Sequence, residues 1–365
     1  DNQAKYTEII PRFLLDDSIS RSNNLLLSNY QQFVKNYINP NTPYQRLLIE
    51  WQTGTGKSIG ALSIAMNFIK TYKIENDLGH KEIGTIFVIG FSERIFKNEL
   101  LRFPEFGFLS RDERLTLDKL KQVASTGSKT DTDKYLDMII KIKKRFSNRK
   151  GNGFFKFIGY RAFVNRIFIS KPGISIDTMT EAEIYTALKK QDIEYNTELL
   201  AKFKNSLIIC DEIHNVYNSI EKNNWGIAVQ SVLDKEPTCR AIFMSATPLN
   251  NSPTEIIDLL NLLVPEKERV TKQDLFLSDK TLKPTAYEKI AELSKGRISY
   301  LRDVNPQYYP RISMQGEQLK VIPYLRFIRC PMSSFQYKTY AAIYNGALTQ
   351  DSQYIMDFVL ENPDT

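Results

Sequence analysis

A glycine-rich loop between an apolar run and a helical pattern constrains the fold of this chain more than any other feature. The loop, Gln52–Ser58, fits the pattern G-x-x-x-x-G-K-[ST] when its first position is relaxed. The residues before it, Arg46–Trp51, indicate a short strand, and Ser58–Tyr72 indicate a helix with an apolar face. A strand, a loop and a helix in this order predict that backbone N–H groups and a helix N-terminus bind phosphate.

The residue types in this loop predict individual roles in binding ATP and Mg²⁺. Glycine at positions 54 and 56 lets the backbone approach the phosphates closely, and Lys57 would reach the β and γ phosphates. Ser58 would place its hydroxyl on Mg²⁺. The candidate nucleotide-binding residues are Thr53, Gly54, Thr55, Gly56, Lys57 and Ser58.

A second motif, Asp211-Glu212-Ile213-His214, follows the apolar run Ser206–Cys210. A carboxylate at a strand tip can hold Mg²⁺, so we predict Asp211 as a metal ligand and a catalytic residue. Glu212 would position or deprotonate the attacking water. By themselves, two acids after a strand are equally well explained as loop residues that cap a helix. Beside a phosphate-binding loop, we favour the catalytic interpretation.

A third motif, Ser245-Ala246-Thr247-Pro248, ends the predicted strand Ala241–Met244. The hydroxyls of Ser245 and Thr247 can form hydrogen bonds to the acidic motif and transmit its state to a neighbouring lobe. We predict that His214 couples the nucleotide site to this loop, although a lone histidine is more often a packing residue. The alternative for the loop is a strand that ends at a proline with capping hydroxyls.

The three motifs in this order resemble those of the superfamily 2 helicases of the DExH type. The longer run Ser245–Pro265 is similar to the Swi/Snf-type branch. Lys295–Arg302 and Cys330–Tyr340 are similar to segments of the poxvirus-like transcription ATPases. These are the nucleoside triphosphate phosphohydrolase I and early transcription factor small-subunit helicases of large cytoplasmic DNA viruses. The resemblance implies a nucleic-acid-dependent ATPase, a helicase or translocase, in viral transcription.

The resemblance also implies roles for residues outside the three motifs. Gln31 lies where these families have a glutamine that reads adenine. Six residues on loops or helix starts occupy the places of nucleic-acid contacts, although each is equally typical of a loop or helix surface: Phe91, Ser92, Arg94, Lys97, Tyr160 and Arg161. Contacts of this kind to phosphates would bind nucleic acid without reading its sequence.

Alternating predicted strands and helices indicate an α/β fold with a parallel sheet. The resemblance makes this a RecA-like P-loop NTPase lobe with a helical insertion and a helical C-terminal extension. We predict an N-terminal arm at 1–24, the lobe at 25–265 with an insertion near 103–150, and an extension at 266–365 that leads toward a second lobe. No arginine-finger motif is present, so we expect a first lobe whose hydrolysis is weak without the second lobe.

The net charge of +7 weakly favours a polyanionic partner, most simply duplex DNA. The basic run Lys141–Arg145 fits either a nucleic-acid contact or a solvated helix face. RNA polymerase or transcription-factor subunits would be further partners. No apolar run approaches the roughly 20 residues that cross a bilayer. Three isolated cysteines fit a reducing intracellular compartment, which for a viral protein means the host cytoplasm and the virion.

Two other classes of function are compatible with these motifs. A promoter-binding or scaffold subunit could keep a helicase-like fold without hydrolysing ATP. Intact Lys57, Asp211 and Glu212 argue against that class without excluding it. A P-loop enzyme that acts on small molecules has little support, because the third motif and the basic charge would then be coincidental. DNA and RNA, and unwinding and translocation, stay open at this point.

Overall fold

The computed structural model describes most of the chain, as eleven stretches: 25–79, 84–90, 93–124, 129–149, 153–217, 224–249, 252–278, 281–302, 317–319, 327–329 and 332–344. Two compact units make up the chain, Asp1–Val304 and Asn305–Thr365. The second unit contains an antiparallel pair of short strands and one helix: β9 (Glu317–Leu319), β10 (Phe327–Arg329) and α15 (Ser334–Tyr344).

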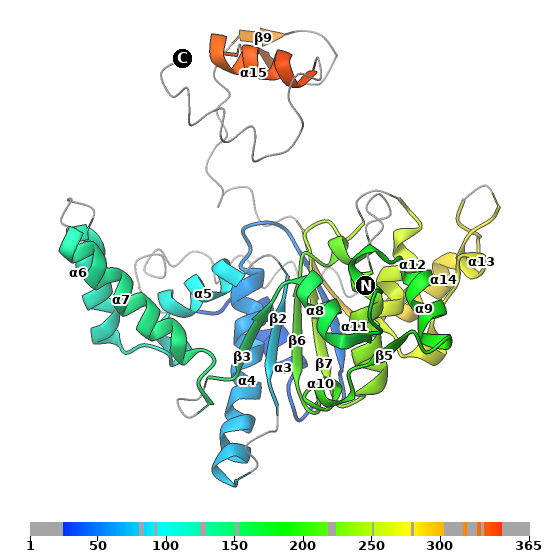
Figure 1. Ribbon diagram of the computed structural model, residues 1–365, viewed down its shortest axis with the longest axis horizontal. Helices are drawn as coiled ribbons and strands as arrows, with labels where there is room; N and C mark the ends of the chain where they lie inside the picture. Colours follow the sequence, from blue (N-terminus) through cyan, green and yellow to red (C-terminus); the bar gives the residue numbers. More distant parts are fainter. Residues whose placement is uncertain are drawn as a thin grey trace. The chain divides into compact units, whose positions relative to one another are not determined.

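The first unit is built on a six-stranded sheet in the order β3-β2-β6-β7-β1-β8 (Figure 1). Every neighbouring pair is parallel. The strands are β1 (Arg46–Trp51), β2 (Ile86–Ile89), β3 (Phe155–Ile158), β6 (Leu207–Asp211), β7 (Arg240–Met244) and β8 (Ile298–Leu301). The central strands β2 and β6 are apolar up to Asp211 at the end of β6, because helices cover both of their faces. The prediction of a RecA-like α/β lobe with a parallel sheet is therefore confirmed.

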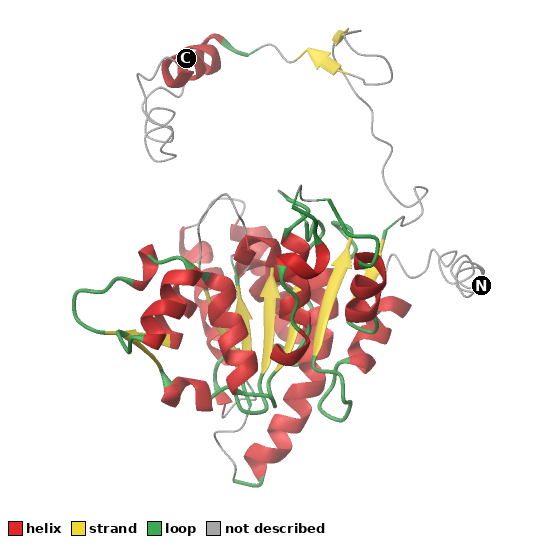
Figure 2. Cartoon of the chain, turned by 90° about the vertical axis from the view of Figure 1, so that its right-hand side faces the viewer, coloured by secondary structure: helices red, strands yellow, loops and turns green. Residues whose placement is uncertain are grey.

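Two hydrophobic clusters, one on each face, hold the helices against this sheet (Figure 2). One face is covered by α3 (Asn29–Tyr37), α4 (Lys57–Asp77) and α5 (Glu93–Arg102), with α6 (Arg111–Ala124) and α7 (Lys129–Arg145) beyond them. The other is covered by α8 (Tyr160–Ile167), α9 (Glu181–Lys189), α10 (Thr197–Ala201), α11 (Trp225–Lys235) and α12 (Glu255–Leu263). A smaller cluster joins α12 to α13 (Lys272–Leu275) and α14 (Ala286–Ser294), and β4 (Phe168–Ser170) pairs with β5 (Ile193–Tyr195).

The segment after residue 265 contributes to the sheet. Strand β8 pairs in parallel with β1, with Leu48 opposite Ile298. From the sequence alone this stretch is predicted to be a helical extension, because a four-residue strand is too short for a periodic signal. The domain limits stay predictions, but the sixth strand comes from within the predicted extension. The segment 103–150, predicted as partly helical, contains α6 and α7, which lie side by side (Figure 1).

Arg46, at the start of β1, ties the sheet to the ends of two helices. Its side chain is buried, and Nη1 donates hydrogen bonds to the carbonyl oxygens of Val264 at 2.5 Å and Leu262 at 3.2 Å. Asp234 lies 3.8 Å from the Arg46 guanidinium and accepts two 2.7 Å bonds from Arg269. Burial lowers the pKa of Arg46 to about 10, and the Asp234 carboxylate opposes that shift. Arg46 therefore satisfies carbonyls that helix α12 leaves open at its end.

Replacing Arg46 with methionine is expected to lower the free energy of unfolding by about 3 kcal/mol, because buried carbonyls lose their donors. Urea unfolding of the two proteins measures this difference. Arg102→Met is the matched control, since the Arg102 side chain is 63% exposed and its ion pair with Glu99 is long, at 4.0 Å. The control should change stability by less than about 0.5 kcal/mol. Equal unfolding midpoints for the two variants would contradict the structural role of Arg46.

Glu181 is a half-buried carboxylate whose surroundings disfavour its charge. Burial and the nearby Asp258 carboxylate raise the pKa of Glu181 to about 7, while a hydrogen bond from the Ile227 N–H acts in the opposite direction. A folded-state pKa above the ordinary value means that the folded protein holds this proton more tightly than the unfolded chain does. Stability from this group is therefore greatest at low pH and is lost as the pH rises through about 7.

Glu181→Gln keeps an oxygen that can accept from Ile227 and removes the charge. We expect this variant to be more stable than the parent by about 1–2 kcal/mol at alkaline pH and nearly equal to it at acid pH. Thermal or urea unfolding across that pH range measures the effect. Glu194→Gln, on the exposed side of β5, is the control and should follow the parent. An unchanged pH profile for Glu181→Gln would refute the assignment.

Candidate active site

Three sequence motifs meet at one end of the sheet. The glycine-rich loop follows β1, the Ser245–Pro248 loop follows β7, and the acidic motif follows β6. Strand β7 lies between the other two, and Met244 at its end pairs with both Ile49 and Asp211. Since parallel strands end at the same edge, the motifs are brought together there. The sequence predicted each loop after a strand, and the strand order makes the three loops neighbours.

The glycine-rich loop has the backbone geometry that its sequence predicts. Gly54 and Gly56 have φ angles of +85° and +80°, in the left-handed region that favours glycine. A Cβ at Gly54 would meet open space, whereas a Cβ at Gly56 would lie 2.6 Å from Gln31 Nε2. Gly56 also begins helix α4 without a side-chain cap. The N–H groups of the first helical turn therefore stay available for an anion.

Lys57 lies between this loop and the acidic motif. Its Nζ donates a hydrogen bond to the carbonyl oxygen of Trp51 at 2.9 Å. Burial lowers the pKa of Lys57, and the carboxylates of Glu212 and Asp211 raise it. The ammonium is thus held by backbone carbonyls at the site where two carboxylates also act on it. A lysine in this position can exchange a carbonyl for a phosphate oxygen.

Helix α3 fixes the loop from the other side. Gln31 is buried, and its Nε2 donates to the carbonyl oxygen of Gly56 at 3.1 Å. Its Oε1 accepts from the Ser28 N–H at 3.0 Å within a capping box. The Tyr30 hydroxyl donates to the carbonyl of Thr55 at 3.1 Å. Gln31 therefore contacts the nucleotide-binding loop, and its role in reading adenine stays a prediction.

The acidic motif contacts the third motif through one buried hydroxyl. His214 Nδ1 lies 2.9 Å from Ser245 Oγ and 3.3 Å from Glu212 Oε2. Ser245 Oγ also accepts from the backbone N–H of Thr247 at 3.1 Å. Ser245 thus joins the two motifs, and Thr247 contributes its backbone N–H while its side chain is exposed. The coupling role of both residues stays a prediction. Glu212 has φ +49°, a strained value for a non-glycine residue beside a predicted active site.

Two residues that position Asp211 were not assigned this role from the sequence. The Tyr160 hydroxyl donates to the Asp211 carbonyl at 2.7 Å, and the ring stacks on Trp225 with centroids 5.2 Å apart. Tyr160 is 1% exposed, so the prediction that it contacts nucleic acid is wrong for this structure. Tyr160 begins the apolar stripe of α8, whose buried residues follow i, i+3, i+4, i+7 spacing, and this signal in the sequence predicts an inward position: Tyr160, Phe163, Val164 and Ile167. Gly90 has φ +139°, and a Cβ there would lie 3.1 Å from the Asp211 carbonyl.

Three further predicted nucleic-acid residues lie on α5 and α8, which follow β2 and β3 at the same edge. Arg94 is exposed on α5. Lys97 pairs with Glu93, and its ammonium lies 4.8 Å from the centre of the Phe157 ring. Arg161 is 74% exposed and pairs with Asp177 at 2.8 Å. Phe91 and Ser92 lie outside the described residues.

Removing the Ser245 hydroxyl tests the link between the two motifs. In Ser245→Ala the Thr247 N–H loses its acceptor, so its amide is expected to exchange with solvent about tenfold faster. Hydrogen exchange followed by mass spectrometry over the Ser245 loop measures this. Thr116→Ala, which removes an exposed hydroxyl bonded to Asp112 on α6, should leave that exchange unchanged. Unchanged exchange in Ser245→Ala would show that the hydroxyl does not hold the loop.

Within the described ranges, no group of three or more His, Cys, Asp or Glu side chains is placed to hold a metal ion. No helix in the part of the chain that the structure describes is both long and apolar enough to cross a membrane.

Comparison with known proteins identifies a family and several viral relatives. The family model described as "Type III restriction enzyme, res subunit" matches residues 24–250. An early transcription factor large subunit homolog of African swine fever virus is 39% identical over 93% of this chain and 33% of its own length. A protein of Acanthamoeba polyphaga mimivirus, whose name assigns it provisionally to the ATP-dependent RNA helicases, is 27% identical over 92% of this chain and 28% of its own.

One solved structure that matches is the SWI2/SNF2 ATPase core of Sulfolobus solfataricus in complex with double-stranded DNA. The match covers 78% of this chain and 46% of that chain. It has a TM-score of 0.41 and 12% identity. The chain spans about a third of the length of the viral relatives, at 33% and 28%. The motifs resemble the small-subunit group of early transcription factors, whereas the African swine fever virus relatives carry the large-subunit name.

Proposed function

The chain belongs to the family described as type III restriction enzyme, res subunit, and we propose that it is the ATP-binding first lobe of a nucleic-acid-dependent ATPase of viral transcription. One observation carries this proposal. Ser245 Oγ lies 2.9 Å from His214 Nδ1 of the acidic motif. Ser245 follows β7, and the glycine-rich loop and the acidic motif follow the two strands that flank β7. A site of this form brings a phosphate-binding loop to the same edge as a carboxylate pair and a coupling loop, and His214 hydrogen-bonds the acidic motif to the coupling loop.

The residues present fit ATP and Mg²⁺. The uncapped start of α4 offers backbone N–H groups to phosphates, and open space beside Gly54 leaves room for them. Lys57 would bind the β and γ phosphates, and Ser58 and Asp211 would hold the ion, with phosphate oxygens and water as its other ligands. Bound Mg²⁺ supplies neutralisation of developing negative charge on the phosphates. Gln31 would read the adenine, with Thr53 and Thr55 lining the loop.

Glu212 would orient the attacking water and accept its proton. Its carboxylate lies 3.3 Å from His214, which contacts Ser245. A change at Glu212 would therefore pass through His214 to the Ser245–Thr247 loop and toward a second lobe. That lobe would supply arginine fingers, which raise the rate by about 10³–10⁵ in related phosphoryl transfer.

Nucleic acid would bind across the starts of α5 and α8, where Arg94, Lys97 and Arg161 can contact phosphates without reading sequence. The net charge of +7 and the names of the viral relatives support this proposal. Duplex DNA is the proposed track, and polymerase or transcription-factor subunits are the proposed partners. The setting would be the host cytoplasm and the virion. The arm at 1–24, the lobe at 25–265 and the extension at 266–365 remain the proposed domain limits.

Two substitutions in the intact parent protein separate binding from turnover. Lys57→Ala is expected to abolish ATP binding, because the phosphates lose their cation. Glu212→Gln should bind ATP normally and hydrolyse it at least about 100-fold more slowly, since it cannot accept a proton. ATP crosslinking and phosphate release, with and without duplex DNA, single-stranded DNA and RNA, measure these effects. Lys70→Ala, exposed on the same helix α4, is the control for Lys57.

Stimulation by one polymer would establish a nucleic-acid motor and identify its track. ATP binding without turnover under every condition would contradict the proposal and favour a scaffold subunit. Normal hydrolysis by Glu212→Gln would refute the role of that residue in positioning water.

A further inference from the structure

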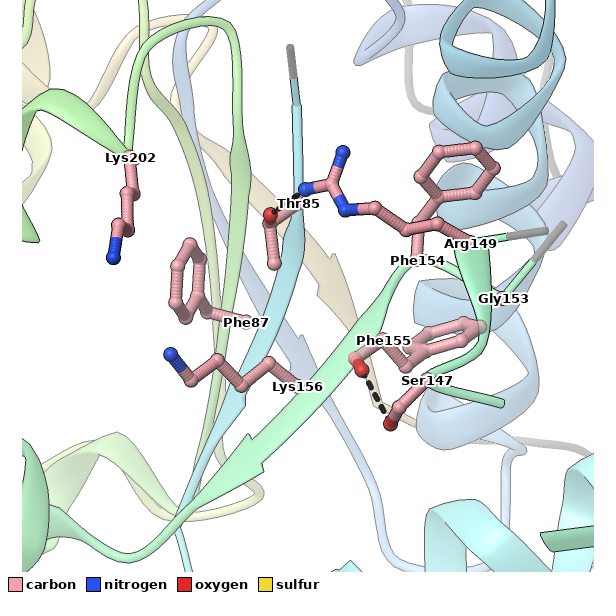
Figure 3. Close-up of a pocket in the computed structure, with 9 residues that line it drawn as sticks. All are labelled: Thr85, Phe87, Ser147, Arg149, Gly153, Phe154, Phe155, Lys156 and Lys202. Atoms are coloured by element: carbon pink, nitrogen blue, oxygen red, sulfur yellow. Dashed lines mark hydrogen bonds between the residues drawn. The ribbon is translucent and has the colours of Figure 1, made fainter. Parts of the chain in front are cut away.

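A cavity lies at the opposite end of the sheet from the candidate active site. It has a volume of about 460 Å³ and is bounded by the beginnings of β2 and β3 and by the segment after α10 (Figure 3). The candidate active site lies at the carboxyl ends of the strands. This cavity lies at the amino ends of β2 and β3, where Phe87 and Phe155 line it. The two sites therefore use different parts of the fold.

The charged residues that line this cavity are all basic: Arg149, Lys156 and Lys202. Arg149 is fixed by its own contacts. Its Nη2 donates to the Gly84 carbonyl at 2.8 Å and to Thr85 Oγ1 at 2.7 Å, and its guanidinium lies 5.6 Å from the centre of the Phe154 ring. The Arg149 guanidinium is therefore held in place at the edge of the cavity, and the ammonium groups of Lys156 and Lys202 are the cations that can contact a ligand.

The two lysines flank the Phe87 ring, and their ammonium groups lie on the same side of the cavity (Figure 3). Lys156 Nζ is 5.6 Å from the centre of the Phe87 ring. Within the part of the chain that the structure describes, neither ammonium forms an ion pair with a carboxylate. Burial, then the positive charges of Arg166 and Lys202, lower the pKa of Lys156. The charged groups that shift the pKa of Lys156 are thus both cations, and no carboxylate offsets them.

We propose that this cavity binds a phosphate ester, with its negative charge between Lys156 and Lys202. A phosphate offers three strong acceptor oxygens, and charge-assisted bonds to ammonium groups are stronger than neutral ones. The partly apolar surroundings of Phe87 and Phe155 strengthen such bonds and suit the organic part of an ester. The same chemistry is offered by a free nucleotide and by a nucleic-acid strand. This inference is independent of ATP binding at Lys57.

Labelling with pyridoxal 5′-phosphate tests this site, because the probe carries both a phosphate monoester and an aldehyde. The neutral amine of Lys156 adds to the aldehyde and water leaves, which gives an imine. Borohydride then delivers hydride to the imine carbon and solvent supplies the proton, which leaves a stable secondary amine. Mass spectrometry of the full chain locates the label. The experiment is done in a Lys57→Ala background, so that the predicted ATP site does not contribute.

Lys156 is expected to be labelled, and inorganic phosphate is expected to protect it. In Lys202→Ala, the phosphate concentration needed for protection should rise about tenfold, because one charged partner is lost. Lys202→Arg keeps the charge and should restore protection. Lys204→Ala is the matched control, since Lys204 is exposed two residues further on and does not line the cavity.

Thymidine 5′-monophosphate and a short 5′-phosphorylated oligothymidylate then distinguish the two sources. Protection at lower concentration by the mononucleotide assigns the site to a free nucleotide, and protection at lower concentration by the oligonucleotide assigns it to a strand. The proposal is overturned if none of the three phosphates protects Lys156, or if protection is the same in Lys202→Ala as in Lys204→Ala. Neither result depends on whether the chain hydrolyses ATP.

Discussion

The parallel pairing of β7 between β1 and β6 is the constraint on which the candidate active site depends. Because these three strands end at one edge, the Ser245 N–H donates to the Ile49 carbonyl at 3.3 Å although the two residues are far apart in the chain. The 2.9 Å contact between His214 and Ser245 exists only because β6 and β7 are neighbours in register, with Asp211 opposite Met244. A shift of one residue in that register would turn Ser245 toward the other face of the sheet.

The supports of this edge come from both faces of the sheet. Gln31 and Tyr30 of α3 hold carbonyls of the glycine-rich loop, and Tyr160 of α8 holds the carbonyl of Asp211. Both groups use neutral side-chain donors to fix backbone carbonyls, so the charges of the site are left for chemistry. At the opposite end of β1, Arg46 uses its buried guanidinium to fix the ends of α11 and α12. The site is thus positioned by backbone anchors on separate elements.

The distribution of charge separates the two ends of the sheet. At the candidate active site, Lys57 lies near the carboxylates of Asp211 and Glu212, so both signs of charge are present before any ligand binds. At the amino ends of β2 and β3, Lys156 and Lys202 have only cations as charged neighbours in the cavity. A site with both signs of charge suits a reaction that needs both. A cavity lined by basic residues without carboxylates suits the binding of an anion.

The sequence by itself determined the parallel α/β class and the local form of each motif. Strand-length apolar runs before Gln52, Asp211 and Ser245 have one physical explanation, which is burial between two layers of helices. Strand β1 begins and ends at the predicted residues, Arg46–Trp51, because its apolar run stops at the glycine-rich loop. The tertiary structure decided what depends on strand order and on short segments: the place of β8 in the sheet, the contact of Tyr160 with Asp211, and the position of Lys156 and Lys202 at one cavity. Contacts between residues far apart leave no periodic pattern in the chain, so only the folded structure shows them.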